Sequence, residues 1–152
     1  MTDERVAPPR LLKPLNRVLM IMLRLGLPVP GAEAPVILTV PGRRSGKPRS
    51  TPITPMHIDG NRYVVSCYPG ADWARNVRAA NDAALRQGRR SERVRMIELA
   101  PDEARPVLRE FPVKVPTGVD LMKRVGVLAD GSPAELESLA GRLPVFRIDT
   151  VT

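Results

Sequence analysis

Cysteine, histidine and aromatic residues are scarce in this chain of 152 residues. It has one cysteine and one histidine, and only 3% of its residues are aromatic. A single cysteine cannot form a disulfide within the chain or supply a cysteine-based zinc site, so nothing indicates secretion. The single histidine, His57, excludes a histidine-cluster metal site and weakens a Ser-His-Asp interpretation. The function must therefore rest on other residue types.

Long apolar runs are also missing. No run approaches the ~18 apolar residues that a membrane-spanning helix needs, and the N-terminus has no signal-peptide pattern. We therefore expect a cytoplasmic protein. Residues 1–35 are interpreted as an N-terminal arm followed by an amphipathic helix within 11–27. That helix is basic enough to lie on the inner face of a membrane or to contact lipid, and packing on the rest of the protein is the alternative.

Charge of one sign dominates the chain. Lysine and arginine total 24 and aspartate and glutamate total 16, giving a net charge of +8. Such a balance favours an anionic partner: a nucleic acid, a membrane surface, or a phosphorylated or polycarboxylate ligand. Few aromatic residues are available to stack on bases and no nucleic-acid-binding motif is present, so we expect no nucleic-acid partner.

Short strands with local turns make up most of residues 36–152, which we interpret as a single domain. The pattern predicts about six mostly antiparallel strands, helices over 72–81, 101–111 and 132–139, and an irregular stretch over 112–133. The predicted strands are 36–40, 49–58, 63–67, 83–87, 93–99 and 145–148. Regular strand–helix alternation, a Rossmann fingerprint and a P-loop are all missing. An α+β, mainly β fold with a small antiparallel barrel and flanking helices is therefore expected.

A basic, glycine-bearing turn joins the first two predicted strands. Residues 42–49 read Gly-Arg-Arg-Ser-Gly-Lys-Pro-Arg and contain no acidic residue. Glycines allow a tight turn with exposed N–H groups, while guanidinium groups and a serine hydroxyl donate to phosphate or carboxylate. The turn is therefore a candidate anion site, with a solvated charged loop as the alternative.

Residues 38–49, 51–52, 59–66 and 73–80, in this order and spacing, resemble the deazaflavin-dependent nitroreductase family. The resemblance covers about residues 36–105. It implies a split β-barrel similar to the flavin-mononucleotide-binding barrels and reduced coenzyme F420 as the cofactor. F420 combines a deazaflavin ring with a phosphodiester and a polyglutamate tail. Flavin mononucleotide (FMN) is the less favoured cofactor, because the arginine-rich turn is oversized for one phosphate.

The resemblance also implies a set of cofactor-binding residues. They are Arg43, Arg44, Ser45 and Lys47 at the phosphate and tail; Arg49, Ser50, Thr51, Pro52 and Ile53 beside the ring; Ser66, Cys67 and Tyr68 at the end of the third strand; and Trp73, Ala74, Arg75 and Asn76 at the start of the next helix.

The implied reaction is hydride transfer to an electron-poor small molecule, such as an enone, a quinone or a nitro compound. The proton donor is Tyr68, a serine or water. Ala74 and residues 112–116 lack tyrosines that the family often has, which argues against nitro reduction. A protein of the same fold that only binds F420, a fatty acid or another lipid is the alternative. A homodimer is a further open alternative.

Overall fold

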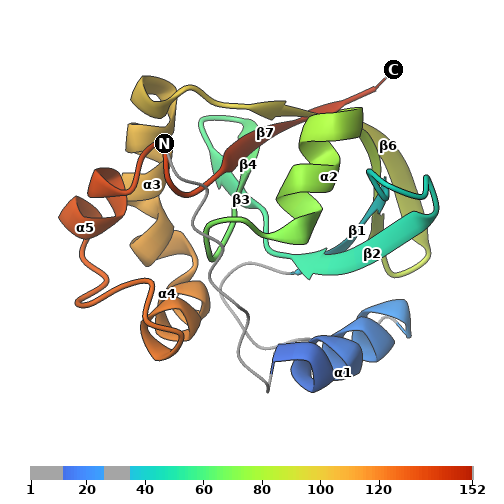
Figure 1. Ribbon diagram of the computed structural model, residues 1–152, viewed down its shortest axis with the longest axis horizontal. Coiled ribbons are helices and arrows are strands. Elements are labelled where there is room, and N and C mark those ends of the chain that lie inside the picture. The colour runs from blue at the N-terminus through green and yellow to red at the C-terminus, as the bar shows by residue number, and fades with distance from the viewer. Residues whose placement is uncertain (1–11, 26–34, 152) are drawn as a thin grey trace.

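The computed structural model describes residues 12–25 and 35–151 of the chain (Figure 1). The elements are α1 (Leu12–Arg24), β1 (Val36–Pro41), β2 (Pro48–Ile53), β3 (Met56–Ile58), β4 (Asn61–Val65), α2 (Asp72–Ala80), β5 (Asp82–Gln87), β6 (Arg90–Glu98), α3 (Pro101–Lys114), α4 (Pro116–Arg124), α5 (Pro133–Ser138) and β7 (Val145–Thr150). Strands and helices do not alternate regularly, and the predicted α+β, mainly β class is confirmed.

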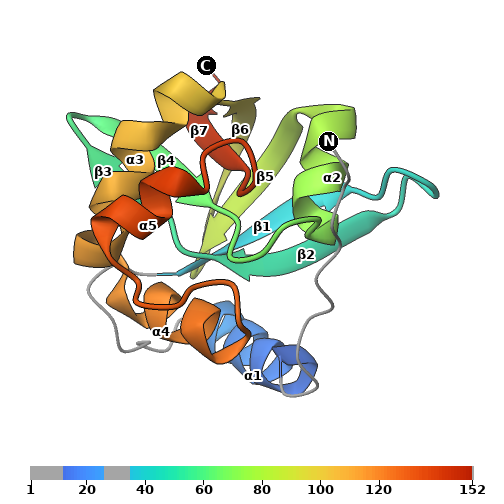
Figure 2. The same cartoon turned by 60° about the vertical axis from the view of Figure 1, so that its left-hand side comes forward.

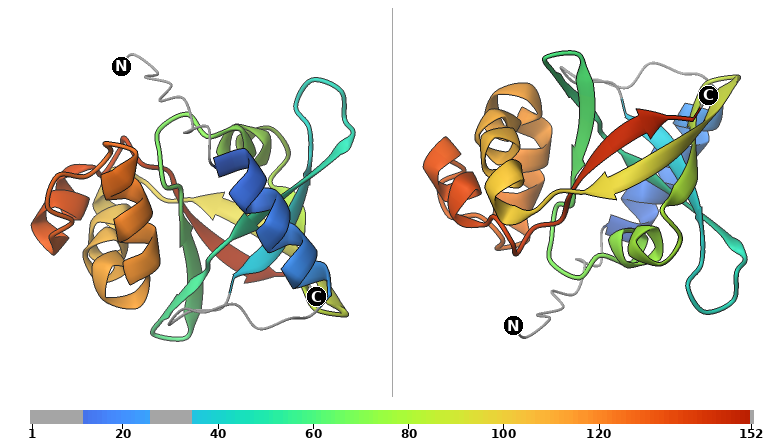
Figure 3. Two further views of the ribbon diagram at one scale, coloured as in Figure 1. Left: turned by 90° about the horizontal axis from the view of Figure 1, so that it is seen from below. Right: turned by 90° about the horizontal axis from the view of Figure 1, so that it is seen from above.

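The described strands form one antiparallel sheet of seven strands in the order β2-β1-β5-β6-β7-β4-β3. Its two edge strands, β2 and β3, follow each other in the chain with only Thr54 and Pro55 between them. The sheet therefore curls until its edges approach each other at this corner, as Figures 1 and 3 show. The result is a split β-barrel, as predicted.

The sequence prediction of one strand over 49–58 was wrong. Up to Ile53 the chain pairs with β1, where Ile53 lies opposite Val36; from Met56 it pairs with β4, opposite Tyr63. Pro55 is buried between the two segments and has no N–H to donate to a ladder. The strand therefore breaks where the chain passes from one sheet edge to the other, and the sheet has seven strands instead of six.

The prediction of irregular structure over 112–133 was also wrong for the first half of that range. Helix α3 continues to Lys114 although Pro106 and Pro112 lie inside it, and α4 follows at once. Pro116 occupies the first turn of α4, where a missing N–H costs nothing. The buried face of α4 compensates for a weak local helix preference.

Two apolar clusters meet across the sheet. One fills the barrel and includes Val64 and Phe146; the other lies under α3, α4 and α5 and includes Val65 and Leu108. Val64 and Val65 are adjacent on β4, so successive side chains of this strand enter opposite clusters. Figure 2 shows these helices gathered beside β3, β4 and β7, while α2 lies over β1.

Helix α1 lies across β1 and β2, as the views of Figure 3 show. Leu23 is buried, whereas Val18, Ile21 and Leu25 are exposed. Within the described residues, no helix combines the length and apolarity needed to cross a membrane. The predicted N-terminal arm ahead of the helix lies outside the described residues.

Candidate functional site

The basic turn between β1 and β2 closes on itself through its backbone. Gly42 N–H donates to the Lys47 carbonyl at 2.8 Å, and Gly46 N–H donates to the Gly42 carbonyl at 2.8 Å. Gly46 has φ +74°, which favours glycine, and Lys47 N–H donates to the Ser45 hydroxyl at 3.2 Å. The turn is therefore a defined loop that presents its arginines at fixed positions.

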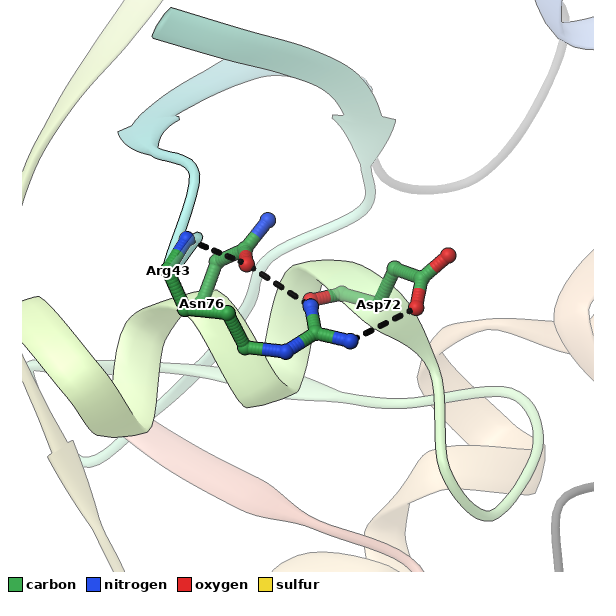
Figure 4. Close-up of polar contacts among 3 residues, drawn as sticks. All are labelled: Arg43, Asp72 and Asn76. Carbon is green, nitrogen blue, oxygen red and sulfur yellow. Dashed lines mark hydrogen bonds and ion pairs between the residues drawn. The ribbon is translucent and has the colours of Figure 1, made fainter. Parts of the chain in front are cut away.

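Arg43 ties this turn to the first turns of α2 (Figure 4). Its backbone N–H and its Nη1 both donate to Asn76 Oδ1, at 3.1 and 2.9 Å. Its Nη2 lies 3.3 Å from Asp72 Oδ1, and its Nη1 lies 3.5 Å from the Asp72 carbonyl oxygen. Asn76 is only 5% exposed, so this link joins the turn to a buried point of the helix.

A groove of about 460 Å³ runs beside the turn. We call it the basic groove; it is lined by Val40, Gly42, Arg43, Arg44, Ser45, Arg49, Ser50, Thr51, Tyr68, Asp72, Trp73 and Asn76. Asp72 is the one acidic residue in the described lining of the groove, and Arg43 pairs with that carboxylate. Arg44 and Arg49 are exposed and form no ion pair within the described part of the chain. The groove therefore offers two guanidinium groups to an anion.

A second cavity, of about 440 Å³, adjoins the basic groove. We call it the apolar chamber; it is lined by Leu19, Thr51, Pro52, Ile53, Thr54, Val65, Cys67, Tyr68, Trp73, Phe111, Val115, Thr117, Gly118, Asp120, Leu121 and Arg124. It lies among α1, β2 and α4, which Figure 2 shows stacked together. Thr51, Tyr68 and Trp73 line both cavities, so groove and chamber meet at these residues.

The residues at this junction are held in place by contacts with neighbouring buried residues. Trp73 packs its ring against Phe146 of β7, with the ring centroids 5.6 Å apart and the planes inclined by 52°. The hydroxyl of buried Ser66 donates to the Tyr68 carbonyl at 2.9 Å, and Ser66 N–H donates to the Pro144 carbonyl at 2.9 Å. The junction is therefore built on the barrel core and on β4.

Cys67 lines the chamber but is poorly suited to act as a nucleophile. Burial of the sulfur raises the pKa of the Cys67 thiol to about 11, from 9.0 for a free thiol. The reactive form of a cysteine is the thiolate, which this environment disfavours. A structural role for Cys67 in the chamber wall follows.

The structure places most of the residues named by the resemblance around these two cavities. Four do not line either one: Lys47, Ser66, Ala74 and Arg75. Lys47 is exposed in the turn, Ser66 and Ala74 are buried, and Arg75 is half-buried on α2. Ser66 donates its hydroxyl hydrogen bond to the carbonyl of Tyr68, which lines both cavities.

Sequence reasoning missed the wall of the chamber that α4 supplies. Thr117, Gly118, Asp120, Leu121 and Arg124 all come from the stretch expected to be irregular. The signal was present, because Val115, Val119 and Met122 recur at helical spacing directly around Pro116, which suits a helix start.

Comparison with known protein families gives one match that covers most of the chain. A family model described as F420H2-dependent quinone reductase matches residues 19–125. That range contains every residue that lines the groove and the chamber. No curated protein matches the chain.

Several solved structures are similar to the chain. The protein Atu2129 of unknown function from Agrobacterium tumefaciens is 14% identical, with a TM-score of 0.53, over 79% of this chain and 51% of that one. A structure described as an F420-H2 dependent reductase (FDR-A) is 21% identical, with a TM-score of 0.47, over 76% and 93% of the two chains. A domain-swapped dimer is also 21% identical, with a TM-score of 0.48, over 91% and 96%.

Proposed function

The chain belongs to the F420H2-dependent quinone reductase family, and on this premise we propose that it binds reduced coenzyme F420 and passes a hydride to an electron-poor small molecule. The junction of the basic groove with the apolar chamber at Thr51, Tyr68 and Trp73 carries the proposal. It offers one cationic and one apolar compartment, side by side.

The residues present fit such a cofactor. Its phosphodiester and polyglutamate tail match Arg44 and Arg49, which have no acidic partner in the described residues. Its ring matches the chamber wall formed by Ile53, Val65 and Phe111, which are buried. Ser45 and Ser50 add hydroxyl groups along the groove.

Arg43 has a different role from Arg44 in this proposal. Its guanidinium is engaged by Asn76 and Asp72, so it fixes the turn to α2 and leaves Arg44 to contact the anion. A turn fixed before binding loses less conformational freedom when the ligand arrives. Arg43 is therefore a positioning residue.

When bound, the reduced deazaflavin supplies a hydride, that is, both electrons of the reduction. The acceptor also needs one proton to complete a two-electron reduction. Tyr68 lines both cavities and carries a hydroxyl, so it is the side chain that we assign to hold that proton, with water as the other source. Apolar residues of the chamber exclude bulk water from the transfer.

The acceptor we favour is a quinone or an enone. The chamber wall is largely apolar, with Thr117, Asp120 and Arg124 of α4 as its polar part. A flat, apolar acceptor with carbonyl oxygens matches this composition. Tyrosines expected for nitro reduction are missing from 112–116, where the chain reads Pro-Val-Lys-Val-Pro.

Turnover with different acceptors tests the proposal. Purified protein is mixed with reduced F420 and a short-chain quinone, an enone or a nitro compound, and reoxidation of the deazaflavin is followed by absorbance. We expect quinone- or enone-dependent oxidation, a lower kcat for Tyr68→Phe and unchanged F420 affinity in that variant. Tight F420 binding without oxidation by any acceptor would instead identify a carrier. Fatty acid that co-purifies, with no F420 binding, would identify a lipid-binding protein.

Two partner predictions go with this proposal. Homodimer formation is tested by light scattering of the purified chain. Membrane contact of α1, whose Val18, Ile21 and Leu25 are exposed, is tested by sedimentation with anionic vesicles.

A further inference from the structure

A third cavity, of about 700 Å³, lies away from the basic groove. It is lined by Val36, Pro55, His57, Arg62, Leu85, Arg86, Gln87, Arg89, Arg90, Ser91 and Glu92. Val36 begins β1 and Val40, in the groove, is near its end, so the two cavities are about 13 Å apart along the strand. We call it the hairpin cavity, because the β3–β4 and β5–β6 hairpins form its walls.

The strand register places part of the cavity lining on the interior face of the β5–β6 hairpin. Leu85 of β5 is buried in the barrel, and Glu92 lies opposite it on β6. Gln87 and Arg90 form the next pair on the same face, because side chains alternate with a period of two. The same alternation places Arg86, Ser91 and Arg93 on the other face; Arg86 and Ser91 still line the cavity, whereas Arg93 is exposed and does not. The hairpin cavity therefore continues the barrel interior outward beyond Leu85.

An ion pair joins the two hairpins across the cavity. Arg62 Nη1 of β4 lies 2.6 Å from Glu92 Oε1 of β6, and Arg62 Nη2 donates to the Thr150 hydroxyl at 3.0 Å. His57 lies opposite Arg62 in the β3–β4 ladder. These contacts fix the distance between the two hairpins. They also engage Glu92, the one acidic residue in the described lining of the cavity.

Three arginines of the cavity are left without an acidic partner. In the part of the chain that the structure describes, Arg86, Arg89 and Arg90 form no ion pair. Arg86 Nε donates to the Gly88 carbonyl at 2.9 Å, which holds that guanidinium at the turn. Three like charges within five residues repel each other, and a bound anion would remove that repulsion.

We propose that the hairpin cavity binds a small organic phosphate, independently of the F420 site. Guanidinium groups pair with phosphate through two parallel hydrogen bonds, and Gln87 and Ser91 offer further polar groups. Buried Val36, Pro55 and Leu85 form a floor for the organic part of the ligand. Among the described residues, the cavity lining has no Phe, Tyr or Trp on which successive bases could stack, and His57 is its one aromatic ring, which favours a small ligand over a polynucleotide.

Calorimetric titration with adenosine monophosphate tests this proposal, using full-length protein saturated with F420. We expect one site per chain. Arg90→Glu should weaken its binding at least about tenfold and leave F420 affinity unchanged. Arg93→Glu makes the same charge change on the opposite face of β6, and should leave both affinities unchanged. Arg90→Gln, a milder change at this exposed position, should give an intermediate loss.

Several outcomes would overturn the proposal. The proposal is wrong if adenosine monophosphate gives no heat of binding, or if Arg90→Glu and Arg93→Glu lose affinity for it equally. It is also wrong if adenosine monophosphate displaces F420, or if citrate binds more tightly than adenosine monophosphate. Far tighter binding of a single-stranded oligonucleotide, lost in Arg90→Glu, would identify a nucleic-acid surface instead. If F420 itself fails to bind, the same titration is made with the Arg44→Glu variant without F420. That variant weakens anion binding in the basic groove, so the titration still tests the hairpin cavity.

Discussion

Arg43 donates two hydrogen bonds to the same atom of Asn76. The backbone N–H and Nη1 of Arg43 both reach Asn76 Oδ1, at 3.1 and 2.9 Å, across 33 positions of the sequence. This pair connects the basic turn to a helix whose Trp73 packs on the barrel core. The position of the neighbouring Arg44 therefore depends on a contact that Arg44 itself does not make.

Replacing Asn76 tests that dependence. Asn76→Ala removes the acceptor for both Arg43 donors and should lower the free energy of unfolding by about 1–3 kcal/mol. F420 affinity should fall as well, although Asn76→Ala removes no charge. Urea unfolding and F420 titration measure the two effects. Asn76→Asp keeps the acceptor oxygen and should retain most of the affinity; equal losses in the two variants would contradict this role.

Arg44 and Lys47 belong to the same turn but should behave differently. Arg44 lines the basic groove and Lys47 does not. Arg44→Glu should weaken F420 binding at least about tenfold, because a charge-assisted contact is worth about 1.5–3 kcal/mol. Lys47→Glu changes net charge equally and should have a much smaller effect. If the two reversals weakened binding equally, only the long-range field of the turn would matter.

The Cys67 thiol should react slowly in the folded protein. Its pKa is raised to about 11 from 9.0, so at pH 8 the thiolate fraction is about a hundredfold lower than in the unfolded chain. Since this is the one cysteine of the sequence, alkylation by iodoacetamide reports it directly. The native rate should be far below the rate in urea. Equal rates would show that the sulfur is not in the environment described.

The same shift predicts a pH dependence of stability. Because the folded pKa lies above the unfolded one, ionisation favours the unfolded chain. The contribution of Cys67 is constant below about pH 9 and turns unfavourable as pH rises from about 9 to 11. Cys67→Ser should lack this part of the loss when urea unfolding is compared at pH 8 and 10.5. An unchanged difference between the two pH values would contradict the prediction.

Gly118 marks a close contact in the chamber wall. A Cβ built there would lie 2.7 Å from Phe111 Cζ, so the ring or α4 must move in Gly118→Ala. Overpacking costs about 1–3 kcal/mol, which outweighs the ~1 kcal/mol that alanine gains in a helix. We expect a lower melting temperature and a higher KM for the acceptor. Thr117→Ala, at the exposed neighbouring position, should change the melting temperature little; a stabilised Gly118→Ala would show that the contact relaxes freely.

Local sequence patterns predicted most strands, the helix at 72–81 and the barrel class. These patterns failed where contacts between residues far apart in the chain determine the secondary structure and the strand pairing. Nothing in residues 49–58 shows that Ile53 and Met56 pair with different strands at opposite sheet edges. Pro112 reads as a helix breaker, yet buried Phe111 holds α3 in place to Lys114.

The candidate site was predictable at its charged end and much less so at its apolar end. The basic turn is contiguous in sequence, so its composition alone indicated an anion site. The ion pair of Arg43 with Asp72 joins residues far apart in the chain, and Ile53 and Leu121, which line the same chamber, are also far apart in it. Only the folded structure brings these residues together.

Trp73 allows the most direct test of the central claim, because it is the one tryptophan of the sequence and lines both groove and chamber. F420 is titrated into the protein while tryptophan fluorescence is followed at low and high salt, with FMN as the comparison ligand. We expect saturable quenching by F420 that weakens steeply with salt, and much weaker binding of FMN. Binding of FMN as tight as that of F420, or no quenching by F420 at all, would contradict it.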